Sequence, residues 1–137
     1  MIFSNEKYGW GYDGIYQYIV ESLSCDKFKS HEVGDYQGDS IVFFKKGSKF
    51  GILNHAYGSC SGCDSYQACE NSEKELANLA EAFKDSVVWY DSAEEFIDYC
   101  ENKWLEGDAG YHIHDNDYVE IYKSKARCFV EKSCNSN

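Results

Sequence analysis

The sequence predicts an α+β fold, in which a small, mainly antiparallel sheet is packed with about four helices. Three observations support this prediction. Residues 40–57 have the pattern of two β-strands joined by a two-residue turn, and residues 87–90 form a further short run of β-forming residues. Ser72 and Ser92 each begin a capping box that is followed by apolar residues at helical spacing. Helices of this kind bury their apolar stripes against a sheet.

The first half of the chain is predicted to hold one helix followed by the hairpin. Apolar residues at every fourth position indicate a helix from Asp13, its N-cap, to about residue 28. The hairpin joins strands 40–46 and 49–57 through Gly47-Ser48, a turn whose first residue is a glycine. The first strand carries four consecutive apolar residues, 41–44, so we expect that both of its faces are covered.

Three further helices are predicted in the second half of the chain. Two of them begin at the capping boxes of Ser72 and Ser92, and the strand at residues 87–90 separates them. The apolar stripe of the second helix consists of Phe96, Ile97, Cys100 and Trp104. A last helix is expected from Asp117 to about Cys134, because its apolar residues do not alternate as those of a strand would.

Length and composition indicate one folded domain, residues 1–137, which is large enough to bury a single core. Hydrophobic residues make up 43% of the chain and aromatic residues 17%, which excludes global disorder. The chain has 12 tyrosines, whose rings suit both the edge of a core and a binding surface.

The sequence predicts a cytoplasmic protein without a membrane segment. No apolar run approaches the ~20 residues that a membrane-spanning helix needs. The first ten residues lack the basic start and apolar stretch of a secretory signal. Seven cysteines, an odd number, agree with thiols that remain reduced in such a compartment.

The formal net charge of −11 lies mostly in the second part of the chain. Residues 1–57 carry six basic and seven acidic residues, whereas residues 58–137 carry seven basic and 17 acidic residues. Such a field repels the phosphates of nucleic acids, so direct binding to nucleic acid is not expected. It attracts a protein with a basic surface, although acidic residues also serve solubility alone.

Residues 55–69 hold the densest set of reactive side chains. Two of the cysteines form a C-x-x-C pair, whose spacing allows two thiolates to bind one zinc ion. The candidate zinc ligands are His55, Cys60, Cys63 and Cys69, with His112 and His114 as a further pair. The second tight pair that is typical of a structural zinc site is missing from the sequence.

Three other interpretations of this segment remain open. A C-x-x-C thiol can be reactive, although no βαβ unit surrounds this pair and the neighbouring Asp64 opposes a thiolate. The glycines and serines of residues 58–62 could present backbone N–H groups to the phosphate of a nucleotide, although no P-loop lysine follows them. The simplest interpretation is a tight turn with the cysteines buried beneath it.

The string Tyr57-Gly58-Ser59-Cys60-Ser61-Gly62-Cys63-Asp64 resembles a motif of small, acidic, uncharacterised proteins that are encoded by bacteriophages. The resemblance covers this string, and the pattern of residues 72–104 is only loosely similar. It implies a phage origin, and it supplies no established activity and no catalytic residue.

By analogy with small acidic phage proteins, we expect that the chain binds a host protein and inhibits it. Inhibitors of restriction, anti-CRISPR proteins and other counter-defence proteins that act on nucleases or further nucleic-acid-binding proteins belong to this class. The alternative is a small zinc- or nucleotide-binding protein that uses residues 55–69. An enzyme has the least support, because the sequence lacks a nucleophile–base pair at motif spacing and a dinucleotide-binding loop.

The acidic, tyrosine-bearing second half is predicted to be the partner-binding surface. In the helix that begins at Ser92, the apolar stripe faces the core and turns the carboxylates outward. Like charges at such short spacing repel one another, and a basic partner would offset that repulsion. The predicted partner-binding residues are Glu94, Glu95, Asp98, Glu101, Asp108, Asp115 and Asp117.

The zinc hypothesis gives a first testable prediction. If zinc is bound, Cys60 and Cys63 are its principal ligands, because the C-x-x-C spacing lets both thiolates reach one ion. Elemental analysis of protein purified without chelator should then find about one zinc ion per chain. A content well below one zinc per chain would remove the hypothesis.

Overall fold

The computed structural model describes residues 2–34, 38–58, 64–104 and 116–135. Within these ranges four antiparallel strands form one sheet in the order β1-β2-β3-β4, which is also their order along the chain. The strands are β1 (Lys27–Gly34), β2 (Gly38–Lys46), β3 (Lys49–Tyr57) and β4 (Val88–Tyr90). The predicted α+β fold, with its hairpin and its short strand near residue 88, is confirmed.

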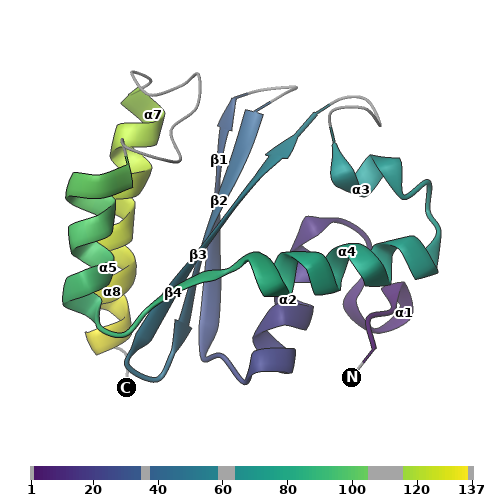
Figure 1. Cartoon of the computed structure of the whole chain (residues 1–137), viewed down its shortest axis with the longest axis horizontal. Coiled ribbons are helices and arrows are strands. Elements are labelled where there is room, and N and C mark those ends of the chain that lie inside the picture. Colours follow the sequence, from purple (N-terminus) through teal and green to yellow (C-terminus); the bar gives the residue numbers. More distant parts are fainter. Residues whose placement is uncertain (1, 35–37, 59–63, 105–115, 136–137) are drawn as a thin grey trace.

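Helices cover both faces of the sheet (Figure 1). The first face carries α1 (Asn5–Tyr8), α2 (Tyr12–Leu23), α3 (Ser65–Ala68) and α4 (Glu73–Ser86). The second face carries α5 (Ala93–Asp98) with its π-helical continuation η1 (Tyr99–Lys103), and the C-terminal run of α7 (Asn116–Val119), η3 (Glu120–Lys125) and α8 (Ala126–Asn135). None of the helices in the described ranges is long and apolar enough to cross a membrane.

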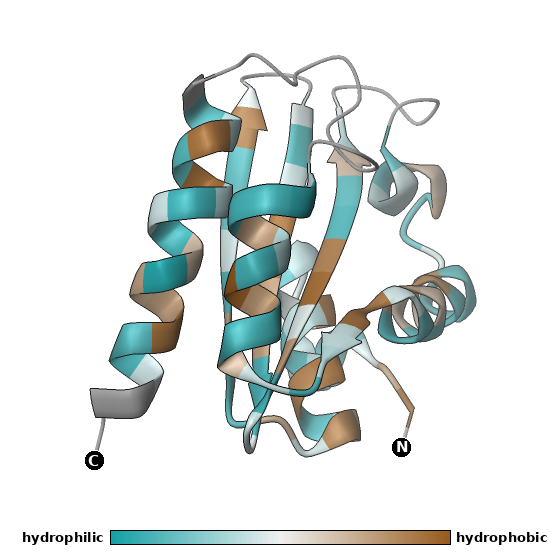
Figure 2. Ribbon diagram, turned by 60° about the vertical axis from the view of Figure 1, so that its left-hand side comes forward, coloured by the Kyte–Doolittle hydropathy of each residue, from teal (hydrophilic) through white to brown (hydrophobic). Residues whose placement is uncertain are grey.

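Strand β2 lies between two separate cores. Val42 and Phe44 pack in the core beneath α2 and α4, whereas Ile41 and Phe43 pack in the core beneath α5 and α8. All four side chains are at most 1% exposed, as expected for a strand that is apolar on both faces. Figure 2 shows the resulting layers, with apolar stretches within the strands of the sheet behind two helices along which polar and apolar residues alternate.

The predicted helix of residues 13–28 is wrong at both ends. Its N-cap is Gly11 rather than Asp13, which lies in the first turn of α2. The helix ends at Leu23, because Ser24 adopts the left-handed conformation (φ 55°, ψ 43°) that closes many helices. Residues 27 and 28 belong to β1 instead, an edge strand that the sequence prediction missed.

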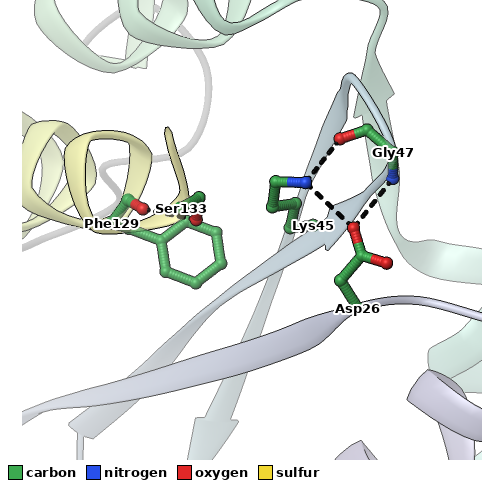
Figure 3. A network of polar contacts seen from close by, with 5 residues as sticks. All are labelled: Asp26, Lys45, Gly47, Phe129 and Ser133. Atoms are coloured by element: carbon green, nitrogen blue, oxygen red, sulfur yellow. Dashed lines mark hydrogen bonds and ion pairs between the residues drawn. The ribbon is translucent and has the colours of Figure 1, made fainter. Parts of the chain in front are cut away.

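A polar network fixes the start of β1 to the turn between β2 and β3 (Figure 3). Asp26 accepts hydrogen bonds from Lys45 Nζ at 2.9 Å and from the Gly47 N–H at 3.1 Å, and Lys45 also donates to the Gly47 carbonyl at 2.7 Å. The lysine and the N–H hold the pKa of Asp26 below its ordinary value. Gly47 has a φ of +60°, which a glycine adopts without the steric cost that a side chain would add.

The second half of the chain confirms the predicted helices and their caps. Ser72 accepts a hydrogen bond from the Glu75 N–H at 3.3 Å, and Ser92 accepts one from the Glu95 N–H at 3.1 Å. The predicted stripe is buried at Phe96, Cys100 and Trp104 and half-buried at Ile97. Rings of the C-terminal helical run enclose Trp104, whose centroid lies 4.5 Å from that of Tyr122.

The two serine caps give a prediction about stability. Ser72→Ala and Ser92→Ala should each lower the free energy of unfolding by about 1 kcal/mol, because each leaves a helix N-terminal N–H without its acceptor. Urea unfolding followed by circular dichroism measures the change. Ser124→Ala, at an exposed position inside the C-terminal helical run, is the control and should cost nothing. Equal stability of all three variants would contradict the capping assignment.

Candidate functional site

The described part of residues 55–69 lies where the end of β3 and the short helix α3 meet the start of α2. His55 is on the face of β3 that packs against α2, and its ring centroid lies 4.5 Å from that of Tyr12 and 4.6 Å from that of Phe83. Residues 59–63, including Cys60 and Cys63, lie outside the described residues. His55 and Asp64 are described residues that lie on either side of these positions.

Asp64 is the centre of a hydrogen-bond network that joins three elements. It is buried, and as the N-cap of α3 it accepts from the N–H groups of Tyr66 at 2.9 Å and Gln67 at 3.2 Å. Its other oxygen accepts from the Gly58 N–H at 3.0 Å. The Tyr12 hydroxyl of α2 donates to it at 2.5 Å. These bonds fasten the end of β3 and the start of α3 to α2.

The network keeps Asp64 ionised. Burial by itself would raise the pKa of this carboxyl, but the hydrogen bonds from Tyr12, Gly58, Gln67 and Tyr66 outweigh burial and hold the pKa below its ordinary value. Burial raises the pKa of the Tyr12 phenol, and its bond to Asp64 raises it further, so the phenol remains a donor at neutral pH. The carboxylate is thus fully engaged by its own chain.

His55 is held as a neutral ring. Its Nδ1 lies 3.1 Å from the Ala56 carbonyl, which can only accept, so Nδ1 carries the hydrogen. Nε2 is then an acceptor, and the Tyr16 hydroxyl donates to it at 2.5 Å. Burial is the main cause that lowers the pKa of His55, so the ring is uncharged at neutral pH.

These contacts bear on the predicted zinc ligands. Both ring nitrogens of His55 are used within the chain, and the Cys69 thiol is buried and donates to the Ser65 carbonyl at 3.3 Å. Among the described residues, no group of three or more His, Cys, Asp or Glu side chains could share a metal ion. His112 and His114, like Cys60 and Cys63, lie outside the described residues, so the zinc site stays a prediction.

The role of Asp64 was missed from the sequence, where this residue was considered only as an obstacle to a thiolate. A signal was present, because an Asp directly before a helical segment is a favoured N-cap. Its partner Tyr12 lies 52 residues away along the chain, and no spacing rule connects the two. The structure therefore assigns Asp64 a role in holding the segment together.

The described residues of the predicted acidic surface divide into exposed carboxylates and carboxylates that bind a partner in α8 or η1. Glu94 and Glu95 are exposed in the first turn of α5. Asp98 accepts from Asn102 Nδ2 at 2.9 Å and pairs with Lys103 at 3.0 Å, and these two contacts lower its pKa. Two partners therefore already satisfy the Asp98 carboxylate.

Glu101 also has a partner within the chain. Arg127 of α8 donates to both of its carboxylate oxygens, one of them at 2.8 Å, and the pair joins η1 to α8. For Asp98 and Glu101, groups of the chain itself therefore offset the repulsion that was expected to need a basic partner. Asp117 is exposed, whereas Asp108 and Asp115 lie outside the described residues.

A groove of about 190 Å³ lies beside the exposed acids, at the edge of the sheet that β4 forms. Its lining residues are Ile52, Asn54, Ser86, Val88, Tyr90 and Tyr99. The rings of Tyr90 and Tyr99 stack with their centroids 5.1 Å apart. Val88 is 55% exposed, an unusual state for a large apolar residue among those that the structure describes. Asp91 follows Tyr90 directly, and Glu95 precedes Tyr99 by one helical turn.

Comparison of the chain with protein-family models, with curated proteins and with solved structures finds no match.

The Asp64 network gives a prediction about stability and pH. Asp64→Asn should lower the free energy of unfolding by about 2 kcal/mol at pH 7, because the charged acceptor of three N–H groups and one phenol is lost. The folded-state pKa lies below the ordinary value of 3.8, so the stabilisation is complete above that pH and is lost as pH falls through the folded-state pKa. The deficit of the variant should therefore shrink in strong acid.

Urea unfolding at pH 7 and at about pH 3 measures this difference. Asp91→Asn is the matched control, since Asp91 is exposed and its ion pair with Lys49 is long, at 3.8 Å. It should change stability by less than about 0.5 kcal/mol at either pH. If Asp64→Asn is as stable as the control at pH 7, Asp64 is not the centre of the network.

Proposed function

We propose that this chain binds a host protein with a basic surface, through the β4 edge and the first turn of α5, and blocks that protein. The observation that supports this proposal best is the groove at the sheet edge, where exposed Val88 and the paired rings of Tyr90 and Tyr99 adjoin exposed carboxylates. A tyrosine-bearing apolar centre with charged surroundings is typical of protein interfaces.

Charge defines the kind of partner that fits. Asp91, Glu94 and Glu95 are exposed within five residues, and Asp91 has a lysine partner only at 3.8 Å. Carboxylates in this state attract cationic side chains and accelerate encounter with a basic protein. Nucleases and other nucleic-acid-binding proteins carry such surfaces, because they bind phosphates with lysine and arginine. An inhibitor of a host defence nuclease, as counter-defence and anti-CRISPR proteins are, belongs to this class by analogy.

The alternative of a zinc- or nucleotide-binding protein centred on residues 55–69 has less support. The described polar groups of that segment, above all those of His55 and Asp64, are engaged by contacts within the chain. The β4 edge, in contrast, offers an exposed apolar side chain beside exposed charge.

The proposal predicts separable effects of charge and of apolar contact. A partner captured from host lysate should bind Asp91→Lys/Glu94→Lys about tenfold more slowly than wild type at low salt, with a weaker salt dependence. Val88→Ser should leave the association rate unchanged and raise the dissociation rate about fivefold, because it removes apolar burial from the interface. Surface plasmon resonance measures both rates.

Glu70→Lys/Glu75→Lys is the matched control. Like Asp91→Lys/Glu94→Lys, it changes the net charge by +4. It places one charge reversal before α4 and one in the first turn of α4, as the test variant does at α5. The control should slow association less than Asp91→Lys/Glu94→Lys does. Equal effects of the two double variants would show that only overall charge matters. A partner that binds nucleic acid equally well at saturating amounts of this chain would contradict the blocking role.

A further inference from the structure

A pocket of about 340 Å³ lies at the opposite edge of the sheet, between β1 and the C-terminal helical run. Its lining residues are Lys27, Phe28, Lys29, His31, Lys125, Cys128, Phe129 and Lys132. Four of the lining side chains are lysines. None of the lining residues that the structure describes is acidic. In a chain with a net charge of −11, this concentration of positive charge stands out.

The positions of these residues follow from the two elements that carry them. In a strand, residues two apart share a face, so Lys27, Lys29 and His31 of β1 all lie on the side of the sheet that α8 covers. In a helix, residues seven apart share a face, so Lys125 and Lys132 are aligned on the helical run. The two sets of lysines therefore converge on one space.

The floor and walls of the pocket are partly apolar. Phe129 is buried, and Lys27 Nζ lies 5.2 Å from the centroid of its ring, in the geometry of a cation–π contact. Phe28 also borders the pocket, but its ring packs against Tyr16 and Phe44 on the other face of the sheet. A ligand here would meet a flat apolar surface together with ammonium groups, the combination that orients small molecules in binding sites.

Among the residues that the structure describes, carboxylates balance the positive charge of the pocket only in part. Lys125 pairs with Glu120 at 3.6 Å, an exposed contact that contributes little. Nε2 of His31 is buried and has no hydrogen-bond partner in the described part of the chain. Burial is the main cause that lowers the pKa of His31. Lys29 and Lys125 lower this pKa further, and Glu120 opposes them.

We propose that this pocket binds a small organic phosphate, with the lysines on the phosphate oxygens and the organic part against Phe129. A phosphate group carries up to two negative charges and accepts hydrogen bonds from several lysines at once, which would relieve the repulsion among them. The volume suits a ligand of about the size of a mononucleotide, at the lower end of small-molecule sites.

The acidic character of the whole chain does not prevent such binding. At physiological ionic strength charges are screened beyond about 8 Å, so a ligand inside the pocket responds mainly to the lysines that line it. The distant carboxylates slow the approach of an anion but do not remove its local contacts. This site is separate from the β4 edge, and its test is independent of the proposed partner.

The experiment measures binding of pyrophosphate and of adenosine monophosphate to the full chain by isothermal titration calorimetry, with sodium chloride added to equal ionic strength. We expect saturable binding of both, with tighter binding of adenosine monophosphate because its organic part packs on Phe129. Tighter binding of pyrophosphate would overturn this placement of the organic part. Absence of saturable binding of either compound would overturn the proposal.

Variants separate the pocket from general charge effects. Lys29→Gln/Lys125→Gln should weaken binding by about tenfold or more, because each lysine makes a charged contact with the phosphate. Its thermal stability without ligand should equal or exceed that of wild type, since like-charge repulsion is reduced. Lys7→Gln/Lys74→Gln, on α1 and α4, carries the same change in charge and should bind as wild type does. Equal loss in both variants would overturn the assignment.

The exposed thiol of Cys128 provides a readout of location. Adenosine monophosphate should slow its alkylation by iodoacetamide severalfold, as followed by peptide mass spectrometry. Cys25, which is half-buried and does not line the pocket, is the internal reference and should alkylate at an unchanged rate. Saturable binding that leaves Cys128 as reactive as before would place the ligand elsewhere and overturn the proposal.

Discussion

The burial of β2 on both faces is the constraint on which the rest of the structure depends. Four consecutive apolar side chains, Ile41 to Phe44, cannot be covered from one side, because neighbouring residues of a strand point in opposite directions. The chain therefore places α2 and α4 on one face and α5 and α8 on the other. Covering the faces in this way leaves the two edges of the sheet as the places where backbone and side chains of strands reach the surface.

The two edges differ in chemistry. The β4 edge combines an exposed apolar residue and stacked tyrosines with the carboxylates of the first turn of α5, and this combination fits a basic protein. The β1 edge combines lysines from a strand and a helix beside Phe129, and the ligand that we propose for it is a phosphate. The Asp64 network lies elsewhere, at the end of β3, where its hydrogen bonds hold α3 against α2. The polar groups of that network serve the fold.

The parts of the structure that local sequence patterns determine could be predicted, and the parts that depend on distant residues could not. The hairpin and the caps at Ser72 and Ser92 follow from a glycine turn and from residues three positions apart. Strand β1 was missed because most of its residues are charged or polar and only Phe28 and Val33 are apolar. Its β-structure depends on the pairing with the distant strand β2. The basic pocket was missed because Lys29 and Lys125 are far apart in the sequence. The predicted zinc ligands Cys60 and Cys63 lie outside the described ranges, so the zinc site stays a prediction.

The central claim is that the partner binds at the β4 edge and leaves the β1 edge accessible. Hydrogen–deuterium exchange of the chain, alone and in complex with the captured partner, tests it directly. The account predicts slower exchange at residues 88–103 in the complex and unchanged exchange at residues 27–34. Slower exchange at residues 27–34 with no change at residues 88–103 would contradict it.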